Sequence, residues 1–192
     1  MHFEEKKSVR KKISAVRNGY QKNWLERKSK IVSGYLVEWP IFKKAKRIFG
    51  YLSFGNEVNI DEVLLYALSE GKEVFVPYID ETKDIMQLVR LHSFNDIEYG
   101  RYDIRTVKNP ELYQRPEDIE LVLNPGLSFT MAGGRMGLGK GYYDKFLALA
   151  PGSIKIGVTL TPQVVEELPL AEHDVLMDYL VTENGITKCF IS

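Results

Sequence analysis

Residues 124–147, NPGLSFTMAGGRMGLGKGYYDKFL, place a glycine-rich loop between an apolar run and a helical pattern. The apolar run, Ile119–Leu123, is of the short kind that forms a buried strand. After the loop, Tyr143, Phe146 and Leu147 recur at helical spacing. The sequence therefore predicts a strand, a long loop and a helix in this order.

The loop has the composition of a phosphate-binding segment. Its closely spaced glycines are Gly133, Gly134, Gly137, Gly139 and Gly141. Such residues let a backbone turn tightly and bring its N–H groups close to a ligand, and a following helix N-terminus favours anions. Arg135 and Lys140 would add full positive charges. A flexible glycine-rich turn without a ligand is the alternative.

The loop does not fit either common nucleotide motif. Residues 134–140 read G-x-x-x-x-G-K, but Gly141 stands where a P-loop needs Ser or Thr for its metal. The loop also begins about ten residues after its strand, which is too far for P-loop geometry. The dinucleotide motif G-x-G-x-x-G is absent. We therefore expect a phosphate loop of another kind.

Composition sets the broad class of the protein. A chain of 192 residues suits one domain, 1–192, with its own hydrophobic core. The formal net charge is zero, which gives no reason to expect nucleic acid or an anionic membrane as a partner. The single Cys189 fits a reducing compartment, and the N-terminus lacks the apolar core of a secretory signal. We expect a cytoplasmic monomer that acts on small molecules.

Hydrophobic patterns predict elements along the whole chain. Expected helices cover about residues 4–17, 21–37 and 60–70, with Asn59 as a cap of the third and a short helix starting at Thr161–Pro162. Expected strands cover residues 47–54, 73–77, 85–91, 119–123, 153–160, 179–182 and 186–190, the last two joined by an Asn184–Gly185 turn. The strand–helix–strand order of residues 47–77 predicts a parallel unit.

Two further features lie outside the glycine loop. The first helix is strongly basic around a narrow apolar stripe of Val9, Ile13 and Val16, which by itself indicates a solvated face. Glu57 lies in the turn after the first predicted strand, where ligands gather in open α/β sheets, although an ordinary turn glutamate fits the pattern too.

These residues carry a family resemblance. Pro125–Gly126, Gly134, Arg135, Gly137 and the run GKGYYD at residues 139–144 resemble the signature of 5-formyltetrahydrofolate cyclo-ligases, also called methenyltetrahydrofolate synthetases. Lys6-x-x-x-Arg10 is similar to the opening of that family, although Lys7 and Lys11 share the same spacing. The segment His173–Glu183 resembles its tail. Departures are Leu138, where many relatives have an aromatic or basic residue, and Asn124, which replaces an apolar one.

The resemblance implies a fold and an activity. The fold would be α/β, in three layers, with a mainly parallel sheet, helices on both faces and a C-terminal hairpin. The activity would be ATP-dependent cyclisation of 5-formyltetrahydrofolate to 5,10-methenyltetrahydrofolate, with release of ADP and phosphate through a phosphorylated formyl (imidate) intermediate. ATP would be the co-substrate and Mg²⁺ the cofactor.

The resemblance also implies roles for individual residues. ATP would bind to Lys6, Arg10, Arg135, Gly137, Gly139, Lys140, Gly141, Tyr142 and Tyr143. Of these, Lys140, Arg135 and Tyr143 would be catalytic. The folate would contact Glu57, Leu138 and Tyr142, and Asp144 and Asp174 would hold the metal. Asp144 could instead stabilise the first turn of its helix. His173 and Tyr102 are expected to be structural or packed residues.

Two other classes of function remain open at this point. One is a sugar-phosphate isomerase or acyl-CoA transferase of similar architecture, which would need its own acid/base pair and no ATP. The other is a non-catalytic nucleotide- or folate-binding module. Release of ADP that depends on 5-formyltetrahydrofolate distinguishes the cyclo-ligase from both.

Overall fold

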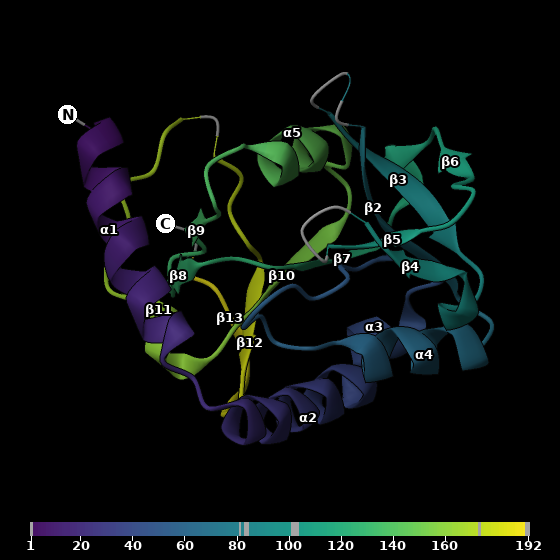
Figure 1. Cartoon of the computed structure of the whole chain (residues 1–192), viewed down its shortest axis with the longest axis horizontal. Coiled ribbons are helices and arrows are strands. Elements are labelled where there is room, and N and C mark those ends of the chain that lie inside the picture. The colour runs from purple at the N-terminus through teal and green to yellow at the C-terminus, as the bar shows by residue number, and fades with distance from the viewer. Residues whose placement is uncertain (1, 81, 83–84, 101–103, 173, 191–192) are drawn as a thin grey trace.

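An eight-stranded sheet forms the centre of the described part of the chain (Figure 1). The computed structural model describes residues 2–80, 82, 85–100, 104–172 and 174–190. The strand order is β13-β12-β10-β7-β1-β2-β3-β6. Their bounds are β1 Arg47–Phe49, β2 Glu73–Asp80, β3 Ile85–Leu91, β6 Leu112–Tyr113, β7 Leu121–Asn124, β10 Ile154–Val158, β12 Tyr179–Thr182 and β13 Gly185–Lys188.

The five strands in the middle of the sheet run parallel. β1 pairs with both β2 and β7, and β10 pairs with both β7 and β12, each in parallel register. β13, β3 and β6 continue the sheet in antiparallel register at its two sides. The expected mainly parallel sheet and the C-terminal hairpin are confirmed.

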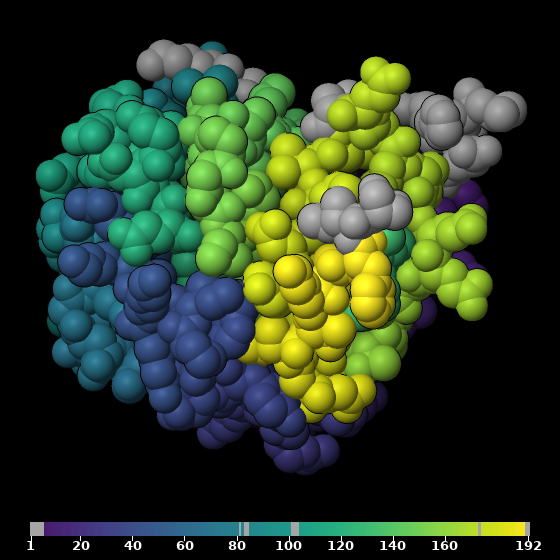
Figure 2. All heavy atoms as spheres, turned by 180° about the vertical axis from the view of Figure 1, so that it is seen from behind, coloured from purple at the N-terminus to yellow at the C-terminus, as the bar shows by residue number. Residues whose placement is uncertain are grey.

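Side chains alternate between two hydrophobic cores, one on each face of the sheet. Ile48 belongs to one core and the neighbouring Phe49 to the other, as period-2 strands require. α2 (Lys22–Glu38), α3 (Pro40–Lys44) and α4 (Asp61–Ser69) cover the first face, and α5 (Tyr142–Leu149) covers the second (Figure 1). Seen from behind, the yellow C-terminal hairpin lies beside the blue and purple helices of the first face (Figure 2).

A small sheet and the first helix lie at one end of the molecule. The small sheet has the order β11-β8-β9, with β8 at Ser128–Thr130, β9 at Arg135–Met136 and β11 at Val164–Val165. α1 (His2–Asn18) lies along this end (Figure 1). Phe129 of β8 is fully buried against the main sheet, where a Cβ atom added to Gly126 or Gly157 would approach its ring to 2.5 Å. These two glycines therefore make the space in which the β8–β9 hairpin docks.

The remaining described elements are short. β4 (Ile97–Tyr99) and β5 (Arg105–Val107) form a separate two-stranded sheet. The 3₁₀ turns are η1 at Phe94–Asp96, η3 at Pro116–Asp118 and η4 at Thr161–Gln163. None of the helices in the described ranges has the length and apolar character of a membrane-crossing segment.

Several predicted boundaries are wrong. The first strand ends at Phe49 instead of residue 54, because the chain then leaves the sheet and folds back through a hydrogen bond from the Tyr51 hydroxyl to the Val58 carbonyl (2.7 Å). Asn59 is also not the N-cap of α4, which is Ile60, although the Asn59 side chain accepts a hydrogen bond from the Asp61 N–H (2.7 Å).

Two predicted turns also differ from the structure. Thr161 lies inside η4, whose N-cap is Leu160, so it is not the cap. In the C-terminal hairpin Thr182 pairs with Gly185, so the two turn residues are 183 and 184, and Gly185 already belongs to β13.

Candidate functional site

The glycine loop is a backbone that only glycine adopts easily at three of its positions. Gly133, Gly139 and Gly141 have φ angles of 87°, 108° and 68°, and Gly141 is the N-cap of α5. The carbonyl of Gly137 accepts a hydrogen bond from Arg10 Nε (3.2 Å). A Cβ atom at residue 139 would lie 3.3 Å from Arg10 Cζ, so the loop and α1 fit closely. Arg10 and the glycine loop, both of which are expected to bind ATP, therefore lie next to each other.

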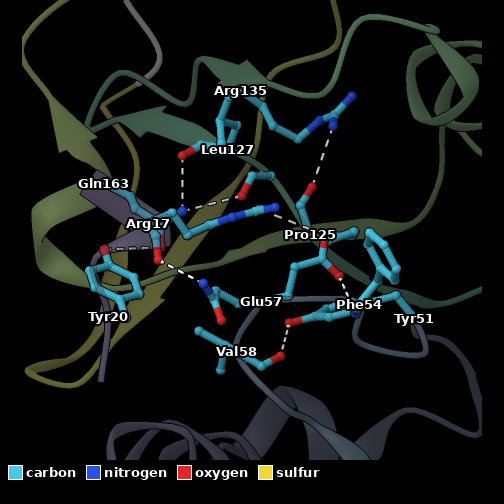
Figure 3. Close-up of polar contacts among 12 residues, drawn as sticks. Arg17, Tyr20, Tyr51, Phe54, Glu57, Val58, Pro125, Leu127, Arg135 and Gln163 are labelled. Carbon is cyan, nitrogen blue, oxygen red and sulfur yellow. Dashed lines mark hydrogen bonds and ion pairs between the residues drawn. The ribbon is translucent and has the colours of Figure 1, made fainter. Parts of the chain in front are cut away.

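Arg135 is held in place beneath the loop. It is 7% exposed, and its Nη2 donates to Asp144 Oδ2 (3.0 Å) while its guanidinium lies 5.4 Å from the centre of the Tyr143 ring. Nη1 donates to the carbonyl of Pro125 (3.4 Å; Figure 3). Arg135 Nε and Asp144 Oδ1 are buried without a hydrogen-bond partner. A donor and an acceptor are thus left for a ligand, since buried polar atoms are normally satisfied.

The other predicted phosphate and metal residues make contacts of their own. Lys6 Nζ lies 2.8 Å from Asp174 Oδ2, which also accepts from the N–H of Ala171 (2.8 Å). Lys140 is exposed and lies 5.7 Å from the centre of the Tyr142 ring. Within the described ranges, no group of three or more His, Cys, Asp or Glu side chains is placed to hold a metal.

Glu57 lies in a polar turn at the carboxyl end of β1. Its Oε2 accepts from the N–H of Phe54 (2.9 Å), and its Oε1 lies 3.8 Å from Arg17 Nη1 of α1 (Figure 3). Burial raises the pKa of the Glu57 carboxyl, while the Phe54 N–H and then the Arg17 and Arg105 charges act to lower it. The carboxylate is therefore one that a ligand with N–H donors would stabilise.

Two spaces adjoin Glu57. A narrow crevice is lined by Tyr51, Glu57, Val58, Pro125, Gly126, Val158 and Gln163. An open cleft of about 570 Å³ is lined by Ser53, Phe54, Gly55, Asn59, Asp61, Tyr99 and Arg105. Arg105 is fixed at the wall of this cleft by Asp61, with Nη1–Oδ2 and Nη2–Oδ1 distances of 2.6 and 2.9 Å. An open cleft thus lies next to the turn that carries Glu57, along Phe54 and Gly55.

Tyr143, the second tyrosine after the loop, packs against the hydrophobic core on the second face of the sheet. Tyr143 is partly covered by Phe49, with ring centres 6.1 Å apart. Burial, and then the charge of Glu57, raises the pKa of the Tyr143 hydroxyl above its usual range. This phenol stays neutral at physiological pH and can donate a hydrogen bond. Leu138, by contrast, is 66% exposed at the outer rim of the loop.

Sequence reasoning missed part of this site. The expected apolar stripe of α1 is wrong in part, because Val16 is 37% exposed whereas Arg17 is 8% exposed. Arg17 continues the spacing of Lys6, Arg10 and Ile13, and this signal was available in the sequence. Gln163, whose Nε2 donates to the Leu127 carbonyl (2.9 Å), had no such signal. Tyr102 and His173 lie outside the described residues.

Comparison with known proteins agrees with this arrangement. A model of the 5-formyltetrahydrofolate cyclo-ligase family matches residues 2–183. A probable 5-formyltetrahydrofolate cyclo-ligase of Caenorhabditis elegans is 28% identical, over 94% of this chain and 94% of its own. The mitochondrial 5-formyltetrahydrofolate cyclo-ligase of Arabidopsis thaliana is 26% identical, over 96% of this chain and 76% of its own.

A solved structure agrees in fold as well as in sequence. The 5,10-methenyltetrahydrofolate synthetase of Aquifex aeolicus superimposes with a TM-score of 0.84 at 32% identity, covering 96% of this chain and 92% of its own. The family model spans both α1 and the glycine loop. The chain therefore belongs to the 5-formyltetrahydrofolate cyclo-ligase family.

Proposed function

We propose that this protein converts 5-formyltetrahydrofolate to 5,10-methenyltetrahydrofolate and splits ATP to ADP and phosphate. The observation that carries the proposal is the convergence of Arg10 and Arg135 on the glycine loop. Pro125 and Gly126 share a crevice with Glu57, and Arg135 donates to the Pro125 carbonyl, which supports a phosphate site and a folate carboxylate next to each other.

The phosphate side of the site uses cations and backbone donors. Lys6, Arg10, Arg135 and Lys140 would supply positive charge, and the N–H groups of Gly137, Gly139, Gly141, Tyr142 and Tyr143 would donate to the phosphates. Phosphoryl transfer asks a protein mainly for alignment and neutralisation of charge. Arg135 suits this role because Asp144 and Tyr143 orient its guanidinium before a ligand arrives.

The folate side uses Glu57 and the cleft next to it. A buried carboxylate suits the N–H donors of a reduced pterin, and the cleft lined by Phe54 and Tyr99 offers aromatic surface for the rest of the molecule. Leu138 lies on the glycine loop and Tyr142 is the first residue of α5, and both would contact the folate near the phosphates. Binding of both substrates at this edge would bring the formyl oxygen toward the γ-phosphate.

The chemistry follows from the weakness of an amide as an electrophile. The formyl oxygen on N5 attacks the γ-phosphorus, the bond to the β,γ-bridging oxygen breaks, and ADP leaves. N10 then attacks the carbon of the resulting imidate phosphate, and loss of its proton and of inorganic phosphate gives the methenyl ring. Lys140 and Arg135 stabilise the charge on the transferred group, and the neutral Tyr143 hydroxyl donates to it.

A buried carboxylate oxygen supports the proposal that this site holds a magnesium ion. Asp144 Oδ1 is buried without a partner, and carboxylate oxygens are the ligands that Mg²⁺ prefers. Asp144 would hold the ion. Asp174 would be the second carboxylate if the ion replaced Lys6 as its partner. When bound, the ion neutralises phosphate charge.

The test is a direct assay of product formation. Protein, ATP, Mg²⁺ and 5-formyltetrahydrofolate are mixed, and the ultraviolet band of the methenyl product is followed together with ADP release. One ADP for each methenyl product is expected. Binding of both substrates without product would indicate a binding module, and product without ADP would exclude the ATP-dependent reaction.

A further inference from the structure

One face of α1 carries three cations toward the site. Lys6, Arg10, Ile13 and Arg17 are spaced so that their side chains leave the helix within an arc of about 60°. Ile13 is 4% exposed and Arg17 is 8% exposed, while Lys11 and Lys12 on the opposite side are exposed. This face of the helix is therefore the one that packs against the rest of the protein.

The two ends of this face contact different parts of the site. Arg10 reaches the glycine loop through Gly137, as described above. About three turns from Lys6, roughly 16 Å along the helix, Arg17 reaches Glu57. The side chains of Arg17 and Glu57 are only 10% and 16% exposed, so this ion pair is largely shielded from water and salt.

A second contact ties the same end of α1 to the Glu57 turn. Asn56 Nδ2 donates to the carbonyl of Arg17 (3.2 Å). The hydroxyl of Tyr20, just after the helix, lies 3.4 Å from Gln163 Oε1 at the crevice. The end of α1 thus forms part of the wall around Glu57.

We propose that Arg17 is a positioning residue for the folate site, because its guanidinium orients the Glu57 carboxylate and supplies the positive charge that faces it from α1. The inference rests on the proposed function, in which Glu57 binds the pterin. It makes α1 a part of both substrate sites, with Lys6 and Arg10 toward the nucleotide and Arg17 toward the folate.

The charges around Glu57 determine what loss of Arg17 would do. Arg17 faces Glu57 from α1 and Arg105 faces it from β5, while Tyr51 and the Tyr143 hydroxyl of α5 are neutral neighbours. Burial already raises the pKa of Glu57, and Arg17 opposes that rise. Without Arg17 the carboxyl takes up a proton at higher pH and no longer accepts from the pterin.

The experiment measures the Kd of 5-formyltetrahydrofolate by titration calorimetry from pH 5.5 to 8.5. For Arg17→Gln we expect a Kd about tenfold higher at pH 7, which is the effect of losing one charge-assisted hydrogen bond. The midpoint of the Kd–pH curve should move to higher pH, and the Kd of Mg–ADP should change less than twofold. Lys12→Gln, which removes an exposed cation from the same helix, should match the wild type.

Further variants separate positioning from a structural role. Asn56→Ala removes the backbone contact of Arg17 but keeps its charge, so it should leave the midpoint unchanged. In a Glu57→Gln background, Arg17→Gln should have no further effect on the pH dependence. If Arg17→Gln does not fold, Arg17→Lys serves instead. The lysine side chain is shorter and would hold its charge farther from Glu57, so the midpoint of the Kd–pH curve should still move to higher pH.

The outcomes distinguish the two proposals. If Arg17→Gln or Arg17→Lys keeps the wild-type midpoint while Glu57→Gln weakens folate binding, the positioning role is overturned and the proposed function stands. If the wild type does not bind 5-formyltetrahydrofolate, or Glu57→Gln binds it normally, the assignment of Glu57 as the pterin ligand fails first.

Discussion

Individual side chains at the glycine loop differ in their burial and in the contacts that hold them in place. Arg135 is buried and bound to Asp144, so its loss would disturb both the fold and the chemistry. Lys140 is exposed on a loop that contributes little to the cores. Substitution of Lys140 is therefore the cleaner test of phosphate chemistry.

Lys140→Ala is expected to lower kcat at least ~10²-fold, because it removes a charge aimed at the transferring phosphate. Steady-state kinetics measure this, and thermal unfolding checks that the fold is intact. Lys145→Ala, an exposed lysine on α5, is the matched control and should keep its activity. A near-normal kcat for Lys140→Ala would remove this residue from the catalytic group.

The two proposed metal carboxylates are tested together. Asp144→Asn and Asp174→Asn should each raise the Mg²⁺ concentration needed for half-maximal activity, and the double variant should be less than additive. The structure supplies the competing outcome, because Asp174 already binds Lys6. If Asp174 only positions Lys6, Asp174→Asn will raise the KM for ATP as Lys6→Ala does, with the Mg²⁺ dependence unchanged.

The limits of sequence reasoning are clear at the residue scale. The glycine loop and its cations were found because glycine and charge are local signals. The ion pairs Lys6–Asp174 and Arg17–Glu57 join residues far apart in the chain, so only the fold reveals them. The sequence does not predict Arg17 on the buried face of α1, because the neighbouring Val16 is apolar and also fits the helical spacing of that face.

At the scale of elements, packing between β8 and β10 places the glycine loop. Phe129 of β8 occupies the space left by Gly157, which lies in β10 at the middle of the main sheet. Periodicity predicted the long helices and β3 well, since these are amphipathic or uniformly apolar. It did not predict the β8–β9 hairpin, whose two strands of three and two residues are too short to show a period.

Gly157→Ala tests this docking. The added methyl would lie 2.5 Å from Phe129 Cε1 and 2.7 Å from Leu180 Cδ2, so neighbouring side chains must shift. We expect the free energy of unfolding to fall by about 1–3 kcal/mol, as for other overpacked cores. Gly152→Ala, where nothing lies within 4 Å, is the control in a urea titration. An equal effect of the two changes would contradict the docking.

At the scale of the whole molecule, several buried acids remain neutral in the folded state. Burial raises the pKa of Tyr20 to about 12 and that of Cys189 to about 11, and it also raises the pKa values of Tyr51 and Tyr143. In the unfolded chain these groups ionise at their ordinary values of 10.0 and 9.0. Folding therefore opposes their ionisation.

The sign of the resulting pH dependence follows by linkage. The folded protein holds more protons than the unfolded chain above pH ~9, so the free energy of unfolding should decrease as the pH rises from ~9 toward ~12. Urea titrations at pH 8, 9.5 and 11 measure the slope. Tyr51→Phe should make the slope shallower, while Tyr35→Phe, at an exposed position on α2, should not. An unchanged slope in Tyr51→Phe would contradict this account.

The position of β1 between β2 and β7 has a consequence for synthesis on the ribosome. β2 follows β1 within about 25 residues, but β7 is made only about 70 residues after β1. At about 5–20 residues per second, β1 waits roughly 4–14 seconds for its second neighbour. During that interval the nascent chain exposes an apolar strand edge, which is a template for wrong pairing. The yield of this protein in a cell should thus depend on how well chaperones shield a half-made sheet.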